Sequence, residues 1–296
     1  MYSEISSNKR KSVLLITVFI ALIIGLGFAY DQVWGVGNYS GVVIAIVISL
    51  LMTMVSYFRG DKIALMTTGA RAVSREENPY LYRMVENLTI ANGMPMPKLY
   101  IMEDTAINAF ATGRKPELAS VAVTRGAIEK LQNEELEGVL AHELSHVKNY
   151  DIRFMMLVAV LVGTIAILSN IFLRARWLGG RRNNREGGGQ FGVALIIIGI
   201  LLAILSPLIA EIIKLAISRR REYLADASGA LLTRYPEGLA RALEKIAAEN
   251  QPMARASQAT AHMFIANPFS GRKIAGLFST HPPVEERVKR LREMGR

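Results

Sequence analysis

The chain has 296 residues, 51% of them hydrophobic, and a mean hydropathy of +0.26. This length allows one or two domains, but the apolar content is too high for an ordinary soluble domain, so part of the chain should lie in a membrane. The absence of cysteine excludes disulfides and thiolate zinc ligands. A net charge of +10 could suggest nucleic-acid binding, but much of it flanks apolar segments, where membrane topology and anionic headgroups explain it.

Four apolar segments are candidates for membrane helices. Two lie near the start, at Val13 to Tyr30 and Gly41 to Phe58, and two lie later, at Phe154 to Leu173 and Phe191 to Ala210. All lack charged residues and approach the length that spans a bilayer. We therefore expect a mainly α membrane protein with four transmembrane helices in two hairpins. The first run is too long for a cleaved signal peptide and lacks a clear small-residue exit, so an uncleaved anchor is favoured.

The basic residues give conflicting signals about topology. Lys9, Arg10 and Lys11 precede the first segment, and the loop after it has no Lys or Arg, which puts the N-terminus in the cytoplasm. The loop of residues 174–190, between the later two segments, holds five arginines and one glutamate and would lie on the opposite side. Either the earlier charges dominate or the second hairpin does not fully cross, and the sequence leaves both open.

The polar stretch between the hairpins combines a helix with short strands. Residues 78–93 show apolar positions at helical spacing between Asn78-Pro79 and Gly93. Residues 98–104 and 118–126 are rich in β-branched residues, and residues 107–113 could form a third strand, which predicts a small sheet. After the second hairpin, residues 238–250 and 282–294 are typical of helices, the last one starting behind two prolines.

The stretch GVLAHELSHVKNYD, residues 138–151, carries the strongest chemical signal. Asn133 can cap a helix here, and that helix places His142 and His146 one turn apart on one face. Zinc accepts neutral imidazole nitrogens, and HExxH on a helix supplies two of the three protein ligands of a catalytic site, with Glu143 able to act as general base. The alternative is a polar helix face without a metal.

A third ligand should come from beyond the second hairpin. If residues 154–217 run there and back, both ends return to one membrane face, and Glu222 lands beside the histidine pair. Asp226, one turn further, suits a hydrogen bond to the other nitrogen of a zinc-bound histidine. The alternative is an exposed acid that pairs with Arg219 or Arg221.

The motifs HELSH, EYLADASGA, INAFATG and GLFSTHPPVEERVKRL together resemble the HtpX family of integral-membrane zinc metalloproteases, which is related to the CAAX prenyl proteases. The resemblance covers nearly the whole chain and implies one Zn²⁺ held by His142, His146 and Glu222, with Glu143 as base and Asp226 in support. It also implies a zincin-like α+β peptidase domain on the cytoplasmic side of the bacterial inner membrane and a role in membrane-protein quality control, often under stress.

Three further residues are candidates with weaker signals. Asn108 and Ala109 would lie on a strand edge where an extended substrate could add by backbone hydrogen bonds, although Asn108 could equally be a turn residue. His281, before two prolines, could donate to the oxyanion of the transition state or only cap a helix. His262 is expected to be structural or exposed.

We therefore expect a zinc metalloendopeptidase that hydrolyses membrane or misfolded polypeptides. The segments would be a membrane hairpin at 1–58, a first peptidase part at 59–153, a second hairpin at 154–217 and a second peptidase part at 218–296. The expected partners are polypeptide substrates and the lipid bilayer, without nucleic acid. A non-catalytic, zinc-stabilised membrane adaptor is the main alternative, and a transporter is a weaker one because repeated intramembrane charges are missing.

Overall fold

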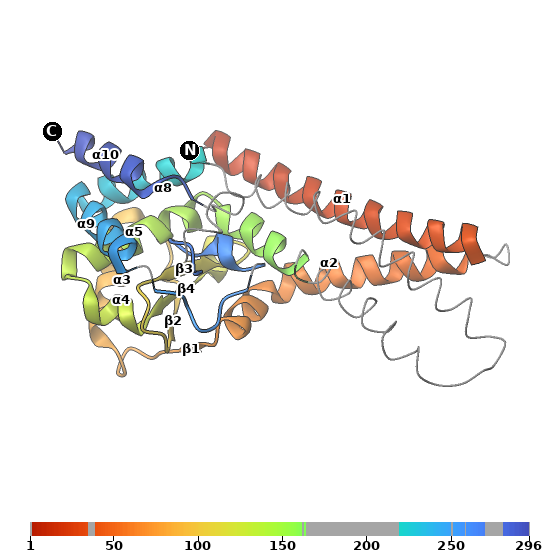
Figure 1. Ribbon diagram of the computed structural model, residues 1–296, viewed down its shortest axis with the longest axis horizontal. Helices are drawn as coiled ribbons and strands as arrows, with labels where there is room; N and C mark the ends of the chain where they lie inside the picture. The colour runs from red at the N-terminus through yellow and green to blue at the C-terminus, as the bar shows by residue number, and fades with distance from the viewer. Residues whose placement is uncertain are drawn as a thin grey trace.

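The protein, seen in a computed structural model, joins a compact α+β part to a rod of two long helices (Figure 1). The structure describes residues 2–34, 39–161, 163, 219–249, 251–257, 259–269 and 281–295. Most of the second apolar hairpin and the loop of residues 174–190 lie outside these ranges. Whether that hairpin spans the membrane, and the four-segment division of the chain, therefore stay predictions.

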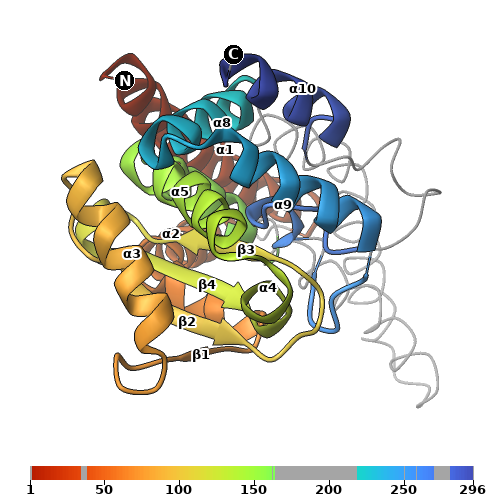
Figure 2. The same cartoon turned by 90° about the vertical axis from the view of Figure 1, so that its left-hand side faces the viewer.

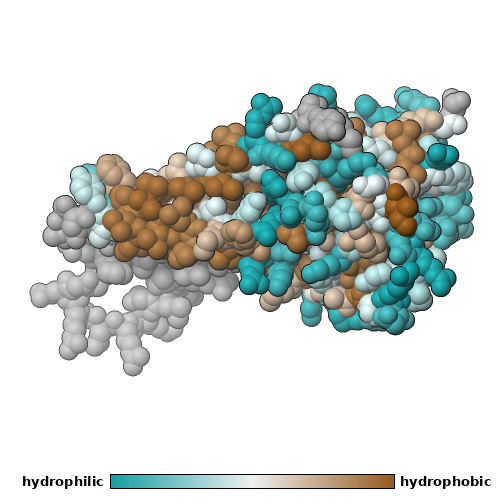
Figure 3. Space-filling model, turned by 180° about the vertical axis from the view of Figure 1, so that it is seen from behind, coloured by the Kyte–Doolittle hydropathy of each residue, from teal (hydrophilic) through white to brown (hydrophobic). Residues whose placement is uncertain are grey.

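The rod is the first apolar hairpin, α1 (Tyr2–Trp34) and α2 (Ser40–Thr67). Both helices are long and apolar enough to cross a membrane, over Ile5–Phe28 and Ser40–Thr67. Hydrophobic side chains gather over them on the face in Figure 3, whereas much of the α+β surface there is hydrophilic. Gly27 lets the helices approach closely, because a Cβ there would lie 2.5 Å from the carbonyl oxygen of Gly41.

The sheet has four strands in the order β1-β2-β4-β3: β1 (Ala70–Ala72), β2 (Lys98–Met102), β3 (Ala109–Thr112) and β4 (Ser120–Thr124). The β2–β4 pair is parallel, and the β1–β2 and β3–β4 pairs are antiparallel. The three strands expected from the sequence are confirmed, and β1 is an addition. β3 pairs with β4 on one side only, so the backbone groups on the other side of β3 are open to hydrogen bonds with a neighbouring segment.

Short helices connect and cover this sheet. α3 (Pro79–Asn92) begins where predicted, since the Asn78 side chain accepts a hydrogen bond from the backbone N–H of Leu81, and it ends at Gly93 in the left-handed conformation. The 3₁₀ turn η1 (Pro116–Leu118) leads into β4, and α4 (Arg125–Lys130) follows it. The apolar side of α3 packs into the same core as β2 and β4.

A group of helices forms the rest of the core: α5 (Asn133–Lys148), α8 (Arg219–Thr233), α9 (Pro236–Glu249) and α10 (Val284–Met294), with the 3₁₀ turn η2 (Ala261–Met263) before the last. α5 lies next to β3 and packs against α8 and α9, and α10 packs on α9 and α8 (Figure 2). Since α5 contacts sheet and helices alike, twelve of its sixteen residues are buried. Residues 151–161 continue as a further helix after a turn.

The expected cap of α5 is wrong by one residue. Gln132, not Asn133, precedes the helix, and its backbone N–H donates to Glu135 Oε2 at 2.7 Å. Asn133 is the first helical residue, and its side chain accepts a hydrogen bond from the Tyr80 hydroxyl. A glutamate in the third helical position that reaches back to the preceding N–H explains the shift.

Candidate metal centre

The HExxH motif lies on α5, as expected, in its buried third and fourth turns. His142 and His146 are 0% and 4% exposed, and their Nε2 atoms lie 3.2 Å apart. The spacing of four residues puts both rings on one side of the helix, so both nitrogens face the same point. Two imidazoles are thus held together by the helix itself.

Glu222 completes the set from the first turn of α8. Its Oε2 lies 3.8 Å from His142 Nε2, and its Oε1 lies 3.6 Å from His146 Nε2. Tetrahedral zinc with bonds of 2.0 to 2.1 Å needs ligand atoms about 3.3 Å apart. Potential ligand atoms of the three residues all lie within 4.8 Å of one another. The set therefore fits zinc after only small adjustments, and three protein ligands leave one position open.

Each histidine is backed by a buried carboxylate on its other nitrogen. His142 Nδ1 lies 2.9 Å from Asp226 Oδ1, and His146 Nδ1 lies 3.0 Å from Asp151 Oδ2. Such carboxylates fix the ring orientation and leave Nε2 for a metal. Asp226 was expected in this place, whereas Asp151 was not.

Burial and these charges set the protonation of the cluster. Burial lowers the pKa of His142, and it would lower that of His146 too, but the hydrogen bond to Asp151 and the charge of Glu222 raise the His146 pKa to about 9. Burial opposes ionisation of Glu222, but the nearby histidines, His281 first, hold its pKa well below the usual range. Near neutral pH and without a metal, Glu222 is therefore ionised and His146 carries a proton, which metal binding has to displace.

Glu143, next to His142 on α5, is a buried carboxyl group. It is 1% exposed, and burial raises its pKa to about 8. Its Oε2 has no hydrogen-bond partner in the part of the chain that the structure describes. A buried polar atom left without a partner is costly, which indicates a reserved position for another molecule. A carboxyl group with a pKa near neutrality can both accept and release a proton.

His281 lies at the centre, just before α10. Its Nδ1 is 2.8 Å from Glu222 Oε2, and it is the partner with the largest lowering effect on the pKa of Glu222. The structure therefore places His281 beside Glu222, the third candidate ligand. Neither the oxyanion role nor the helix cap expected from the sequence anticipated this contact. His262 is structural in its contacts: it is 2% exposed, and its Nε2 donates to the carbonyl oxygen of Met155 at 3.0 Å.

Asn108 and Ala109 lie at the start of the edge strand, but other residues of the chain already contact them. Ile265 N–H donates to the Ala109 carbonyl at 2.9 Å, and the Asn108 amide exchanges hydrogen bonds with the backbone of Ala266. Both residues are buried, at 3% and 0% exposed. A substrate strand could pair with them only after residues 264–266 move.

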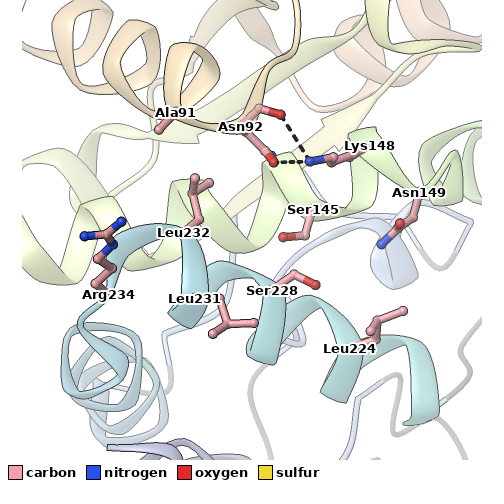
Figure 4. A pocket seen from close by; sticks show the side chains of 10 residues that line it. All are labelled: Ala91, Asn92, Ser145, Lys148, Asn149, Leu224, Ser228, Leu231, Leu232 and Arg234. Carbon is pink, nitrogen blue, oxygen red and sulfur yellow. Dashed lines mark hydrogen bonds between the residues drawn. The ribbon is translucent and has the colours of Figure 1, made fainter. Parts of the chain in front are cut away.

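A separate cavity of about 540 Å³ lies between α3, α5 and α8 (Figure 4). Its lining includes Lys148, whose ammonium donates to the side chain and backbone of Asn92, and Leu231 from α8. None of the candidate metal ligands lines it, so it is not the reaction site.

Three supporting residues had no recognisable signal in the sequence. Asp151 ends the quoted HExxH stretch without a motif of its own, Arg287 lies in the amphipathic last helix, and Asn8 precedes the basic run of the first helix. Their partners are remote in sequence, 61 residues away for Arg287 and Asp226 and 143 for Asn8 and Asp151. Only the fold brings them together.

A His-His-Glu set with a further buried glutamate next to it, beside a small mixed sheet and two helices able to cross a membrane, defines the class of membrane zinc metalloproteases. Comparisons with known proteins support this class and narrow it. The model of peptidase family M48 matches residues 75–295, so the chain belongs to this family.

Relatives agree with this assignment, and a solved structure shares the fold. A protease HtpX homolog of Dictyoglomus turgidum is 46% identical over 294 residues, covering 99% of this chain and 95% of the relative. One of Tropheryma whipplei strain TW08/27 is 46% identical over 295 residues, covering 100% and 99%. The crystal structure of S. mikatae Ste24p matches in fold with a TM-score of 0.51 and 20% identity, over 98% of this chain and 67% of that one.

Proposed function

We propose that the protein hydrolyses peptide bonds of membrane or misfolded polypeptides at a zinc ion held by His142, His146 and Glu222, with Glu143 as general base. The observation that carries this proposal is the geometry of the set. Three ligand atoms are spaced for tetrahedral zinc, and beside them the buried Glu143 has a side-chain oxygen without a hydrogen-bond partner among the described residues. The relatives' name, protease HtpX homolog, supports the same activity.

In the proposed reaction the protein's own groups move the protons. When bound, Zn²⁺ supplies Lewis-acid chemistry, polarising the scissile carbonyl and lowering the pKa of water at the site. Glu143 accepts a proton from the attacking water and gives it to the leaving amine, so no covalent enzyme intermediate is needed. His281 would donate a hydrogen bond to the oxyanion, and its place beside Glu222 supports this role. Asp226 would keep His142 oriented.

Substrate would pair with the edge of β3 in an extended conformation. Backbone hydrogen bonds to a strand edge tolerate many sequences, which suits a protease that acts on diverse unfolded chains. Asn108 and Ala109 would take part once residues 264–266 had moved away. Quality control of membrane proteins, under stress in particular, is the proposed setting.

The proposed location is the inner membrane of a bacterium, with four membrane helices and the peptidase part in the cytoplasm. Both ends of the first hairpin support this orientation: Asn8 of α1 contacts the peptidase part, and α2 leads directly into β1. The basic residues 9–11 follow Asn8 directly, so the positive-inside rule would put the candidate metal centre in the cytoplasm together with them.

The test uses the detergent-purified full chain and compares wild type with Glu143→Gln. Both should bind one zinc per chain, and wild type alone should cleave an unfolded model protein, losing activity with a chelator and regaining it with zinc. Cleavage by Glu143→Gln at the wild-type rate would exclude Glu143 as the base. Equal zinc without cleavage by either protein would favour the non-catalytic adaptor.

A further inference from the structure

The first membrane helix reaches the candidate metal centre through one side chain. Asn8 of α1 is 1% exposed, and its Nδ2 donates to Asp151 Oδ1 at 2.6 Å and to the Asn149 carbonyl at 3.0 Å. The other oxygen of Asp151 lies 3.0 Å from His146 Nδ1. One amide therefore connects a membrane helix to a candidate metal ligand through a single carboxylate.

The contact is made at a strained turn. Asn149 and Tyr150 join α5 to the helix of residues 151–161, and Tyr150 has a φ of 61°, a left-handed conformation that bulky residues rarely adopt. Lys9, next to Asn8, places its ammonium 4.8 Å from the centre of the Tyr150 ring. Two neighbouring residues of α1 thus hold this turn from outside.

Asp151 has a competing partner from a third element. Arg221 Nη1 of α8 lies 3.7 Å from the same oxygen that Asn8 contacts, beyond hydrogen-bond distance. Asp151 is 2% exposed, so its oxygens depend on protein donors. Without the Asn8 amide, the carboxylate is free to turn toward Arg221, and the distance to His146 Nδ1 is no longer fixed.

We infer that Asn8 is a positioning residue of the metal centre, so that α1 contributes to zinc binding and is more than an anchor. Asn8 holds Asp151, Asp151 holds the Nδ1 proton of His146, and His146 Nε2 is thereby presented to the metal. This inference rests on the proposed zinc site. It adds that the affinity of the site depends on how α1 is seated against the peptidase part.

The experiment is a double-mutant cycle on the full chain in detergent, with Asn8→Leu, Asp151→Asn and the two combined. Zinc affinity is measured by competition with a chromophoric chelator, and ligand geometry by the visible spectrum of the cobalt-substituted protein. Asp151→Asn should weaken zinc binding by about 10- to 100-fold, as for other residues that orient metal ligands, and Asn8→Leu by about tenfold or somewhat less. The combined variant should match Asp151→Asn, because Asn8 acts through Asp151.

The control is Thr17→Val, which removes only a hydrogen bond within α1, to the Val13 carbonyl, and should leave affinity and spectrum unchanged. Thermal unfolding of the metal-free variants separates a folding defect from a loss of affinity. Should Asn8→Leu fail to fold, Asn8→Ser removes the same donor with less disturbance.

Two results would overturn the inference: wild-type zinc affinity and cobalt spectrum in the Asn8 variant, or a full additional loss in the Asp151→Asn background. The outcome is independent of cleavage. If wild type binds zinc but cuts nothing, the proposed function fails while the coupling between α1 and His146 can still hold.

Discussion

Arg287 holds the carboxylate of Asp226 with two hydrogen bonds, from Nε at 2.8 Å and from Nη2 at 2.6 Å, and both side chains are buried. Its Nη1 also donates to the Ile265 carbonyl at 3.3 Å, and Ile265 N–H bonds Ala109 of the edge strand. This guanidinium therefore connects the carboxylate behind His142 with the segment that covers β3. A paired fork of this kind fixes direction as well as charge.

Replacement of Arg287 should be severely destabilising. Arg287→Met leaves the Asp226 carboxylate buried without its cationic partner, a change that costs about 3 to 5 kcal/mol in comparable sites. The free energy of unfolding, measured with denaturant in detergent, should fall by that amount. The matched control is Lys289→Met on the same helix: Lys289 is exposed and its ion pair with Glu293 has an N–O distance of 4.0 Å, so the loss should stay below about 1 kcal/mol. Equal losses of unfolding free energy in the two variants would show that the buried pair stabilises the protein no more than the exposed one does.

The same pair predicts how stability depends on pH. Burial would raise the pKa of Asp226, but the charge and hydrogen bonds of Arg287 lower it to about 2, from an ordinary 3.8. A lowered pKa in the folded state stabilises the protein above the ordinary pKa, and this stabilisation disappears as the pH falls toward 2. It amounts to about 2 kcal/mol.

The measurement compares the unfolding midpoints of wild type and Asp226→Asn between pH 6 and 2, in the presence of a chelator. The difference between them should shrink as the pH falls through this range. A difference that stayed constant would mean that Asp226 titrates normally in the folded chain.

A methyl group at Gly229 should disturb the metal centre without touching a ligand. A Cβ there would lie 3.0 Å from the backbone N of His142, so Gly229→Ala pushes α8 away from α5 and moves Glu222 from the two histidines. We expect weaker zinc binding, by about tenfold, and a lower melting temperature. Gly25→Ala is the control, because a Cβ at Gly25 meets no described atom within 4 Å. Unchanged zinc affinity in Gly229→Ala would mean that the helices adjust freely.

His281→Ala distinguishes the two contacts proposed for this residue. Loss of a donor to the oxyanion should lower kcat by about 100-fold or more with little change in KM or bound zinc. Loss of the contact to Glu222 alone should instead weaken zinc binding and leave kcat at saturating zinc. Steady-state kinetics at two zinc concentrations separates these outcomes. His262→Ala is not a suitable control, because that ring is buried in the core and its loss would disturb the fold.

Much of this arrangement could be predicted from local patterns. The helix that carries HExxH, α3 with Asn78 as its cap, and the strands after residue 97 follow from side-chain periodicity and turn residues over a few positions. The approach of Glu222 to the histidine pair followed from the assumption of a returning hairpin, and the cluster of three in the structure fits it. Asp226 lies where the helical spacing from Glu222 indicated.

The rest depends on contacts between distant segments. β1 has three residues, too few for a periodic signal, and it exists because β2 offers an edge. The roles of Asn8, Asp151 and Arg287 arise from packing of helices that the sequence does not place relative to one another. Likewise, nothing near Asn108 indicates that residues 264–266 would cover the same edge.

The residues of the candidate metal centre and its supports come from widely separated parts of the chain: Asn8, then the α5 histidines and Asp151, then Glu222 and Asp226, and finally Arg287. A ribosome makes these parts in that order. Until Arg287 has been synthesised, Asp226 lacks the cation that offsets its burial, and His142 lacks a fixed carboxylate. A growing chain would therefore carry HExxH without a finished site, so peptide-bond hydrolysis would be delayed until folding is complete.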